Sequence, residues 1–98
     1  MALLYIQEYS EMPRINGQLT LMGKEPAVAS QTVAIGGASV QSAPFNANTR
    51  FVRIQSDAIC GYKFGANPTA TTASRMIAGA AEYVGVNPGD KVAVITNT

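Results

Sequence analysis

The sequence predicts an all-β fold: a compact antiparallel β-sandwich or partly closed barrel of about seven or eight short strands. Runs rich in β-branched and aromatic residues recur along the chain, and Gly, Pro or Asn turn residues close each run. Several runs alternate apolar and polar residues with the period of two typical of half-buried strands. Because 98 residues can bury only one core, residues 1–98 are expected to form a single domain.

The first half of the chain contains four runs with strand character. The pair Asn16-Gly17 predicts a tight turn before the second run, in which Leu19 and Leu21 would share one face. Gly36-Gly37 ends the third run. The expected strands are Leu3–Tyr9, Gln18–Met22, Ala27–Ile35 and Ala38–Gln41.

The middle of the chain contains the two clearest strands, Phe51–Ser56 and Ala58–Phe64. Val52 and Ile54 lie on one face of the first, with Arg53 and Gln55 on the other. The second places Ala58, Cys60, Tyr62 and Phe64 on a single face. Since only Asp57 separates them, we expect a core hairpin or an adjoining pair of strands.

The segment Asn67–Ala81 has two interpretations. A helix is the rival to strand and loop, because Asn67 suits a helix cap, Pro68 suits the first helical position, and Ala78–Ala81 contains good helix formers. Three threonines and Gly79 weigh against the helix. We therefore expect strands over Ser74–Ile77 and Glu82–Val86, a turn over Asn87–Asp90 and a final strand over Lys91–Thr96.

Composition narrows the class of protein. A net charge of +1 is too small for nucleic-acid binding by counterion release, so no nucleic acid is expected as a partner. The single Cys60 cannot form an internal disulfide, and the start of the chain lacks the pattern of a signal peptide. No apolar run approaches the roughly 20 residues that span a bilayer. We expect a protein made in the cytosol, with no membrane partner.

No catalytic, cofactor-binding or metal site is predicted. The chain has no His, which removes the commonest general base, and one Cys with no His excludes a structural zinc site. The carboxylates are spread along the chain and are expected at solvated strand ends and turns. Asp57 is the one to watch, since it lies between two core strands and is suited to cap turn amides. The six carboxylates are Glu8, Glu11, Glu25, Asp57, Glu82 and Asp90.

Other reactive or binding residues also have a structural interpretation that we prefer. Cys60 shares a face with apolar neighbours and is expected to be buried and unreactive rather than a nucleophile. Gly61 and Gly65 are interpreted as strand bends, because no phosphate-loop pattern accompanies them. Base stacking by tyrosines would need a basic groove, so they are expected in the core and in interfaces. The tyrosines are Tyr5, Tyr9, Tyr62 and Tyr83.

Strand-and-turn patterns recur over most of the chain in the segments Met1–Ile6, Glu25–Ala27, Phe45–Arg53, Asp57–Cys60, Phe64-Gly65, Asn67–Thr71, Glu82–Val86 and Lys91–Thr98. In these segments the chain resembles small virion-associated structural proteins of tailed bacteriophages. The resemblance rests on patterns of strands and turns, with no residue that carries chemistry.

This resemblance implies a jelly-roll-like β-sandwich in the virion, made in the host bacterial cytoplasm. The expected function is that of a capsid decoration or cement protein, which binds the lattice of the major capsid protein and uses no cofactor. A homodimer or homotrimer is expected, with edge strands near either terminus as the contact. The alternatives are a head–tail junction or fibre component and, behind it, a cytosolic ligand-binding β-barrel; an enzyme comes last.

Overall fold

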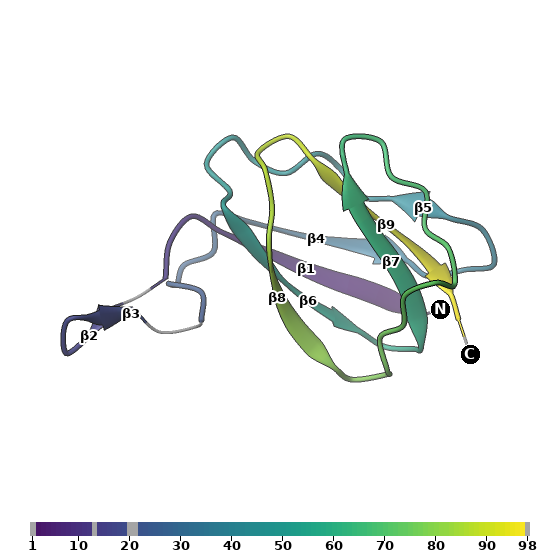
Figure 1. Ribbon diagram of the computed structural model, residues 1–98, viewed down its shortest axis with the longest axis horizontal. Coiled ribbons are helices and arrows are strands. Elements are labelled where there is room, and N and C mark those ends of the chain that lie inside the picture. The colour runs from purple at the N-terminus through teal and green to yellow at the C-terminus, as the bar shows by residue number, and fades with distance from the viewer. Residues whose placement is uncertain (1, 13, 20–21, 98) are drawn as a thin grey trace.

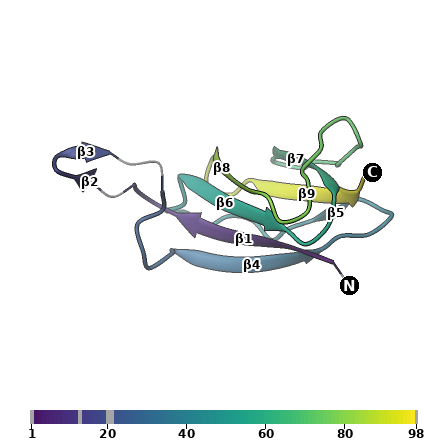
Figure 2. The ribbon, with the colours of Figure 1, turned by 90° about the horizontal axis from the view of Figure 1, so that it is seen from below.

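The computed structural model describes residues 2–12, 14–19 and 22–97, and none of these residues is helical. Two antiparallel sheets pack face to face as a sandwich (Figures 1 and 2). The strand order is β4-β1-β6-β8 in one sheet and β5-β9-β7 in the other. These strands are β1 (Leu3–Tyr9), β4 (Ala29–Ala34), β5 (Val40–Gln41), β6 (Phe51–Ser56), β7 (Cys60–Gly65), β8 (Ala81–Gly85) and β9 (Lys91–Thr96).

The predicted all-β sandwich is therefore confirmed, and the sheets do not close into a barrel. From β4 to β9 the chain crosses to the opposite sheet at every connection, which is the wrapping of a jelly-roll-like sandwich. A search of the described residues finds no helix long and apolar enough to cross a membrane.

The strongest sequence patterns gave correct strand bounds. β1, β6 and β9 begin and end where the alternation predicts, and the other strands of the sandwich overlap their expected runs. The helical alternative for Asn67–Ala81 is wrong, because this segment is loop and turn up to the start of β8. The strand expected over Ser74–Ile77 is also wrong: only Met76 forms a bridge, to Cys60.

A separate hairpin projects from one end of the sandwich. It consists of β2 (Arg14–Ile15) and β3 (Gln18–Leu19), and we call it the arm (Figures 1 and 2). Asn16 and Gly17 have φ angles of 53° and 80°, the positive values that a type I′ hairpin turn requires. The expected shared face of Leu19 and Leu21 lies outside the described residues and side chains. With the arm, the molecule is 44 Å long and 25 Å wide.

The two clearest strands do not pair with each other, so the expected hairpin of β6 and β7 is wrong. β6 lies between β1 and β8, whereas β7 pairs with β9 in the opposite sheet. Residues 57–59 carry the chain across the sandwich, and Asp57 N donates to Leu3 O at 3.1 Å as it leaves the first sheet. A short polar connection between apolar-faced strands suits a crossing between sheets as well as a hairpin.

The strands nearest the two ends of the sequence are both interior strands. β1 lies between β4 and β6, and β9 lies between β5 and β7. Their backbone groups are therefore engaged on both sides, and the expectation of edge strands near either terminus is wrong. The sheet edges are β4 and β8 in the first sheet and β5 and β7 in the second.

The core fills the space between the sheets with aliphatic side chains that alternate along each strand. Fully burying each one contributes about 1.5–3 kcal/mol relative to exposure. The phenyl ring of Phe45 and the side chain of Met76 come from loops and complete the core. The other buried members are Leu4, Ile6, Val33, Ile35, Val52, Ile54, Cys60, Val92 and Val94.

A loop covers the outer edge of β7. The backbone N and O of Cys60 bond to Met76, and the Ser74 hydroxyl both accepts from Tyr62 N at 2.9 Å and donates to Tyr62 O at 2.7 Å. Gly61 permits this approach, because a Cβ there would overlap the carbonyl oxygen of Thr71. The loop thus takes the place of a further strand and blocks this edge.

Glu8 is the one carboxylate buried in the described part of the chain, with 2% of its surface exposed. It shares the inner face of β1 with Leu4 and Ile6. Its Oε1 accepts from the backbone N of Asn46 and from the hydroxyl of Thr49, both at 2.8 Å, and its Oε2 accepts from Gln31 Nε2 at 3.3 Å. The expectation that the carboxylates lie at solvated positions is therefore wrong for Glu8. Neutral donors satisfy it instead of a cation.

We predict that Glu8→Gln destabilises the protein. Two hydrogen bonds with Ala43 fix the orientation of the Gln31 amide. Ala43 N donates to Gln31 Oε1, and Gln31 Nε2 donates to Ala43 O. The one side-chain oxygen of a glutamine at position 8 would still accept from Asn46 N and the Thr49 hydroxyl. Its NH2 group would then face the NH2 group of Gln31, and two donors form no hydrogen bond. The free energy of unfolding in urea should fall by about 1–3 kcal/mol.

The matched control for this prediction is Glu11→Gln. Glu11 forms an exposed ion pair with Lys24 at 3.3 Å, and such pairs contribute about 0–1 kcal/mol. Equal stabilities of the two variants would contradict the role given to Glu8.

Candidate binding face

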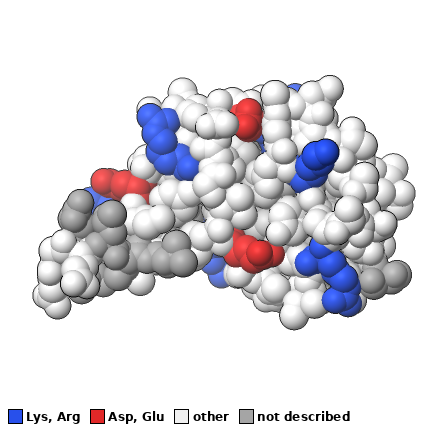
Figure 3. All heavy atoms as spheres, in the orientation of Figure 1, with Lys and Arg blue, Asp and Glu red and all other residues white. Residues whose placement is uncertain are grey.

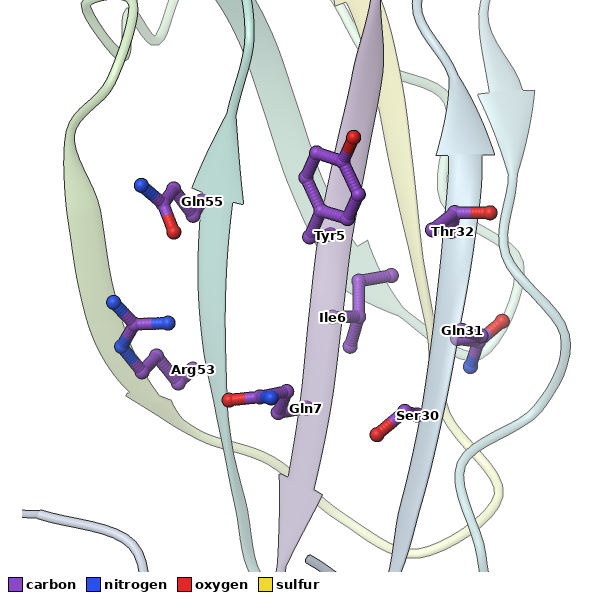
Figure 4. Close-up of a pocket in the computed structure, with 8 residues that line it drawn as sticks. All are labelled: Tyr5, Ile6, Gln7, Ser30, Gln31, Thr32, Arg53 and Gln55. Atoms are coloured by element: carbon purple, nitrogen blue, oxygen red, sulfur yellow. The ribbon is translucent and has the colours of Figure 1, made fainter.

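The outer face of the four-stranded sheet carries a surface depression. It has a volume of about 460 Å³ and lies over β4, β1 and β6 (Figure 4). We call this surface the polar face. Its side chains point away from the core because they alternate with the buried residues of the same strands. They are Tyr5, Gln7, Ser30, Thr32, Arg53 and Gln55.

Strand register arranges these side chains in two rows across the sheet. Tyr5 lies between Thr32 and Gln55, and Gln7 lies between Ser30 and Arg53. Cross-strand neighbours of this kind have Cβ atoms about 4.5–5.5 Å apart, so each row presents a continuous strip of polar groups. Gln7 Oε1 lies 3.0 Å from the hydroxyl oxygen of Tyr9. Within the described residues, no other side-chain polar contact involves this face.

The polar face carries the kinds of side chain that are common in protein–protein interfaces. It combines amides, hydroxyls and one guanidinium with a tyrosine ring that is 43% exposed. Tyr and Arg are enriched at the centres of protein interfaces, where they supply contact area and directed hydrogen bonds. The face contains no nucleophile held by a neighbouring base, which acyl or phosphoryl transfer by side chains would need.

Aromatic packing fixes the base of the arm at one end of the polar face. The Tyr9 ring stacks on Phe51 with centroids 5.5 Å apart, and Phe51 packs against Tyr83 at 6.0 Å. Gly23 lies directly on the Tyr9 ring, where any Cβ would overlap it, and its backbone N donates to Tyr83 OH at 3.3 Å. Tyr9 OH donates to Glu25 Oε2 at 2.7 Å. The sheet therefore determines where the arm begins.

A second depression, of about 340 Å³, lies where β7 and β8 end. Arg50 and Asp90 contribute opposite charges to its lining, with Asn87 beside them. Among the described residues these two charges form no ion pair. Its remaining lining is glycine and apolar side chains, so it offers fewer directed polar groups than the polar face.

The sequence-predicted residues are not brought together into a site. Asp57 is exposed, and its carboxylate makes no hydrogen bond within the described part of the chain, so it does not cap the turn as expected. Tyr62 OH donates to Glu82 Oε2 across the sandwich at 3.3 Å. No group of three or more His, Cys, Asp or Glu that could hold a metal ion occurs among the described residues.

The structure agrees with some of the roles expected for the cysteine, the glycines and the tyrosines and differs from others. Cys60 is fully buried, as expected, and burial raises the pKa of its thiol. Gly61 lies inside β7 and serves close packing rather than a bend, whereas Gly65 ends the strand. Tyr9 is buried, but against Phe51 and Gly23 on the outer side of the sheet rather than in the core cluster, while Tyr5 belongs to the polar face.

Sequence reasoning missed both the polar face and the buried Glu8. The available signal for Glu8 was its spacing of two from Leu4 and Ile6 on one strand. The complementary alternation of Tyr5 and Gln7 marked the opposite face of the same strand. Comparison with protein-family models, curated proteins and solved structures found no match to this chain.

The burial of Cys60 predicts slow reaction with thiol reagents. The thiolate is the reactive form, and both the raised pKa and the surrounding core limit it. The native protein at neutral pH should be labelled by a thiol reagent only at the rate of unfolding, and the urea-unfolded protein should be labelled at once. Rapid labelling of the native protein would contradict this placement.

The environment of Tyr9 leads us to predict that the folded protein loses stability at alkaline pH. Burial, together with the hydrogen bond to Glu25, raises the pKa of Tyr9 from 10.0 to about 12. The folded protein thus holds this proton more tightly than the unfolded chain does, so the stabilisation is complete below pH 10 and is lost as the pH rises through about 12. Urea unfolding across this window should show a smaller loss for Tyr9→Phe than for the wild type. Identical pH dependence of the two proteins would contradict the assignment.

Proposed function

We propose that this protein is a non-enzymatic structural component of a tailed-phage virion, specifically a capsid decoration or cement protein that binds the lattice of the major capsid protein. The observation that carries this proposal is the polar face, an open sheet surface with exposed hydrogen-bonding groups and one exposed tyrosine ring. The resemblance of the sequence to virion-associated proteins points to the same class.

The charge distribution favours contact with another protein. Charged side chains are few on the side of the molecule seen in Figure 3, where the three-stranded sheet faces the viewer, and the net charge is +1. Arg53 is the single charged residue that lines the polar face. Binding that depends on amides, hydroxyls and an aromatic ring changes little with ionic strength, because few screened charges take part.

A symmetric lattice makes weak contacts sufficient. One face of a small domain buries a modest area, which alone gives limited affinity. Repetition at symmetry-related positions raises the effective concentration of each further contact. A sandwich whose face is built on paired strands is suited to this use, because it orders few side chains and no backbone on binding.

The arm favours a second candidate within the virion. It extends beyond the sandwich and presents a type I′ turn at its tip, so it suits contact with an adjacent subunit in a head–tail junction or a fibre (Figure 1). The ligand-binding barrel has less support, since the sheets remain open and the depressions described lie at the surface.

Binding to capsids tests the proposal directly. Purified protein should bind saturably to undecorated capsids, assembled from a tailed-phage major capsid protein, and should raise their melting temperature. Tyr5→Ala and Arg53→Ala should each weaken binding by roughly tenfold or more, as expected for central interface residues.

Lys63→Ala is the matched control. Lys63 is exposed on β7, on the outer surface of the opposite sheet, and its loss should leave capsid binding unchanged. Failure of the wild type to bind capsids would reject the decoration role. Localisation by electron microscopy at the neck or on a fibre would favour the second candidate.

A further inference from the structure

The four sheet edges differ in how they are protected. β7 is covered by the loop that contains Ser74 and Met76, and β5 has only two residues. β8 has five residues and carries the carboxylate of Glu82. β4 has six residues, Ala-Ser-Gln-Thr-Val-Ala, with no charge, proline or glycine. Uncharged, regular edge strands are those that pair with another chain.

The hydrogen-bonding groups on the free side of β4 follow from its register. Ile35 N donates to Ala2 O at 3.0 Å, so the bonded pairs between β4 and β1 continue through Val33–Leu4 and Gln31–Ile6. The backbone groups of the alternate residues therefore point away from β1. These residues are Ser30, Thr32 and Ala34, and within the described part of the chain no backbone bond engages them on that side.

We propose that β4 pairs antiparallel with β4 of a second copy, which joins the two four-stranded sheets into one continuous sheet. A two-fold axis at Thr32 places Thr32 opposite its own equivalent and Ser30 opposite Ala34 of the other copy. Every free N–H and C=O of these residues then meets a complementary group. Because β4 carries no charge, the symmetric pairing brings no like charges together.

The pairing closes on itself. It uses the same strand in both copies, so it yields a dimer and leaves no second β4 edge for growth into a fibre. It also sets the two polar faces side by side on one surface, since Ser30 and Thr32 contribute to both the edge and the face. Dimerisation goes beyond the capsid-binding proposal and is measured without capsids, so either proposal can fail alone.

The proline variant Thr32→Pro tests the backbone contact. Proline removes the N–H at the centre of the free edge and is tolerated on edge strands when the lost donor faces outward. Thr32→Val keeps the N–H and a similar shape. In sedimentation equilibrium the wild type and Thr32→Val should be dimers, and Thr32→Pro should dissociate roughly tenfold or more readily. Far-ultraviolet circular dichroism and slow labelling of Cys60 check that the proline variant is folded.

Engineered cysteines test the register. Facing residues in a bonded antiparallel pair have Cα atoms about 5.5 Å apart, within reach of a disulfide. Thr32→Cys should therefore form a cross-linked dimer rapidly under a mild oxidant. In the same register the two copies of position 30 are displaced by about 14 Å along the strands, so Ser30→Cys should cross-link only slowly, by collision.

Three outcomes would overturn this inference. A wild type that sediments as a monomer or a trimer at high micromolar concentration contradicts the closed pair. A folded Thr32→Pro variant that dimerises like the wild type shows that β4 is not the contact. Faster cross-linking of Ser30→Cys than of Thr32→Cys excludes the proposed register.

Discussion

The buried carboxylate of Glu8 is the constraint on which one end of the sandwich depends. A charge with almost no exposed surface is stable only if donors surround it, and here the donors come from β4 and from the loop that follows β5. That loop is bonded in turn to β9 and to the turn before it, through Ser42 N to Val92 O and Phe45 N to Asp90 O. Glu8 is thereby connected through one loop to both sheets, and the ring of Phe45 from that loop completes the core.

The two surfaces of β1 have opposite chemistry, and this division explains the polar face. Leu4 and Ile6 enter the core, so Tyr5 and Gln7 must point outward from an interior strand of the sheet. Since β1 has neighbours on both sides, its outward side chains are held by rigid backbone. A recognition surface built on such a strand needs little ordering on binding.

Sequence patterns predicted the strands far better than their partners. Alternation sets which residues face the core, and it located β1, β6 and β9 with correct bounds. It contains no information on which strand lies alongside, so β6 and β7 were wrongly paired across Asp57. The segment at Ser74 was expected to be a strand because its composition disfavours a helix. It does lie along the edge of β7, but the Ser74 hydroxyl replaces backbone bonds there.

The polar face was beyond sequence reasoning for a related reason. Tyr5, Thr32 and Gln55 lie on three strands that are distant in the chain, and only the pairing of β1 with β4 and β6 brings them together. Glu8 was missed because carboxylates are rarely buried, a prior that outweighed its position in line with Leu4 and Ile6.

The central position of β9 has a consequence for the order in which the sandwich can form. The first sheet needs nothing beyond Gly85, so β4, β1, β6 and β8 can pair without the end of the chain. β5 and β7 have no common partner until residues 91–96 lie between them, so the second sheet cannot form without β9. A chain that lacks β9 would leave the inner face of the first sheet uncovered, and apolar surface exposed in this way promotes aggregation.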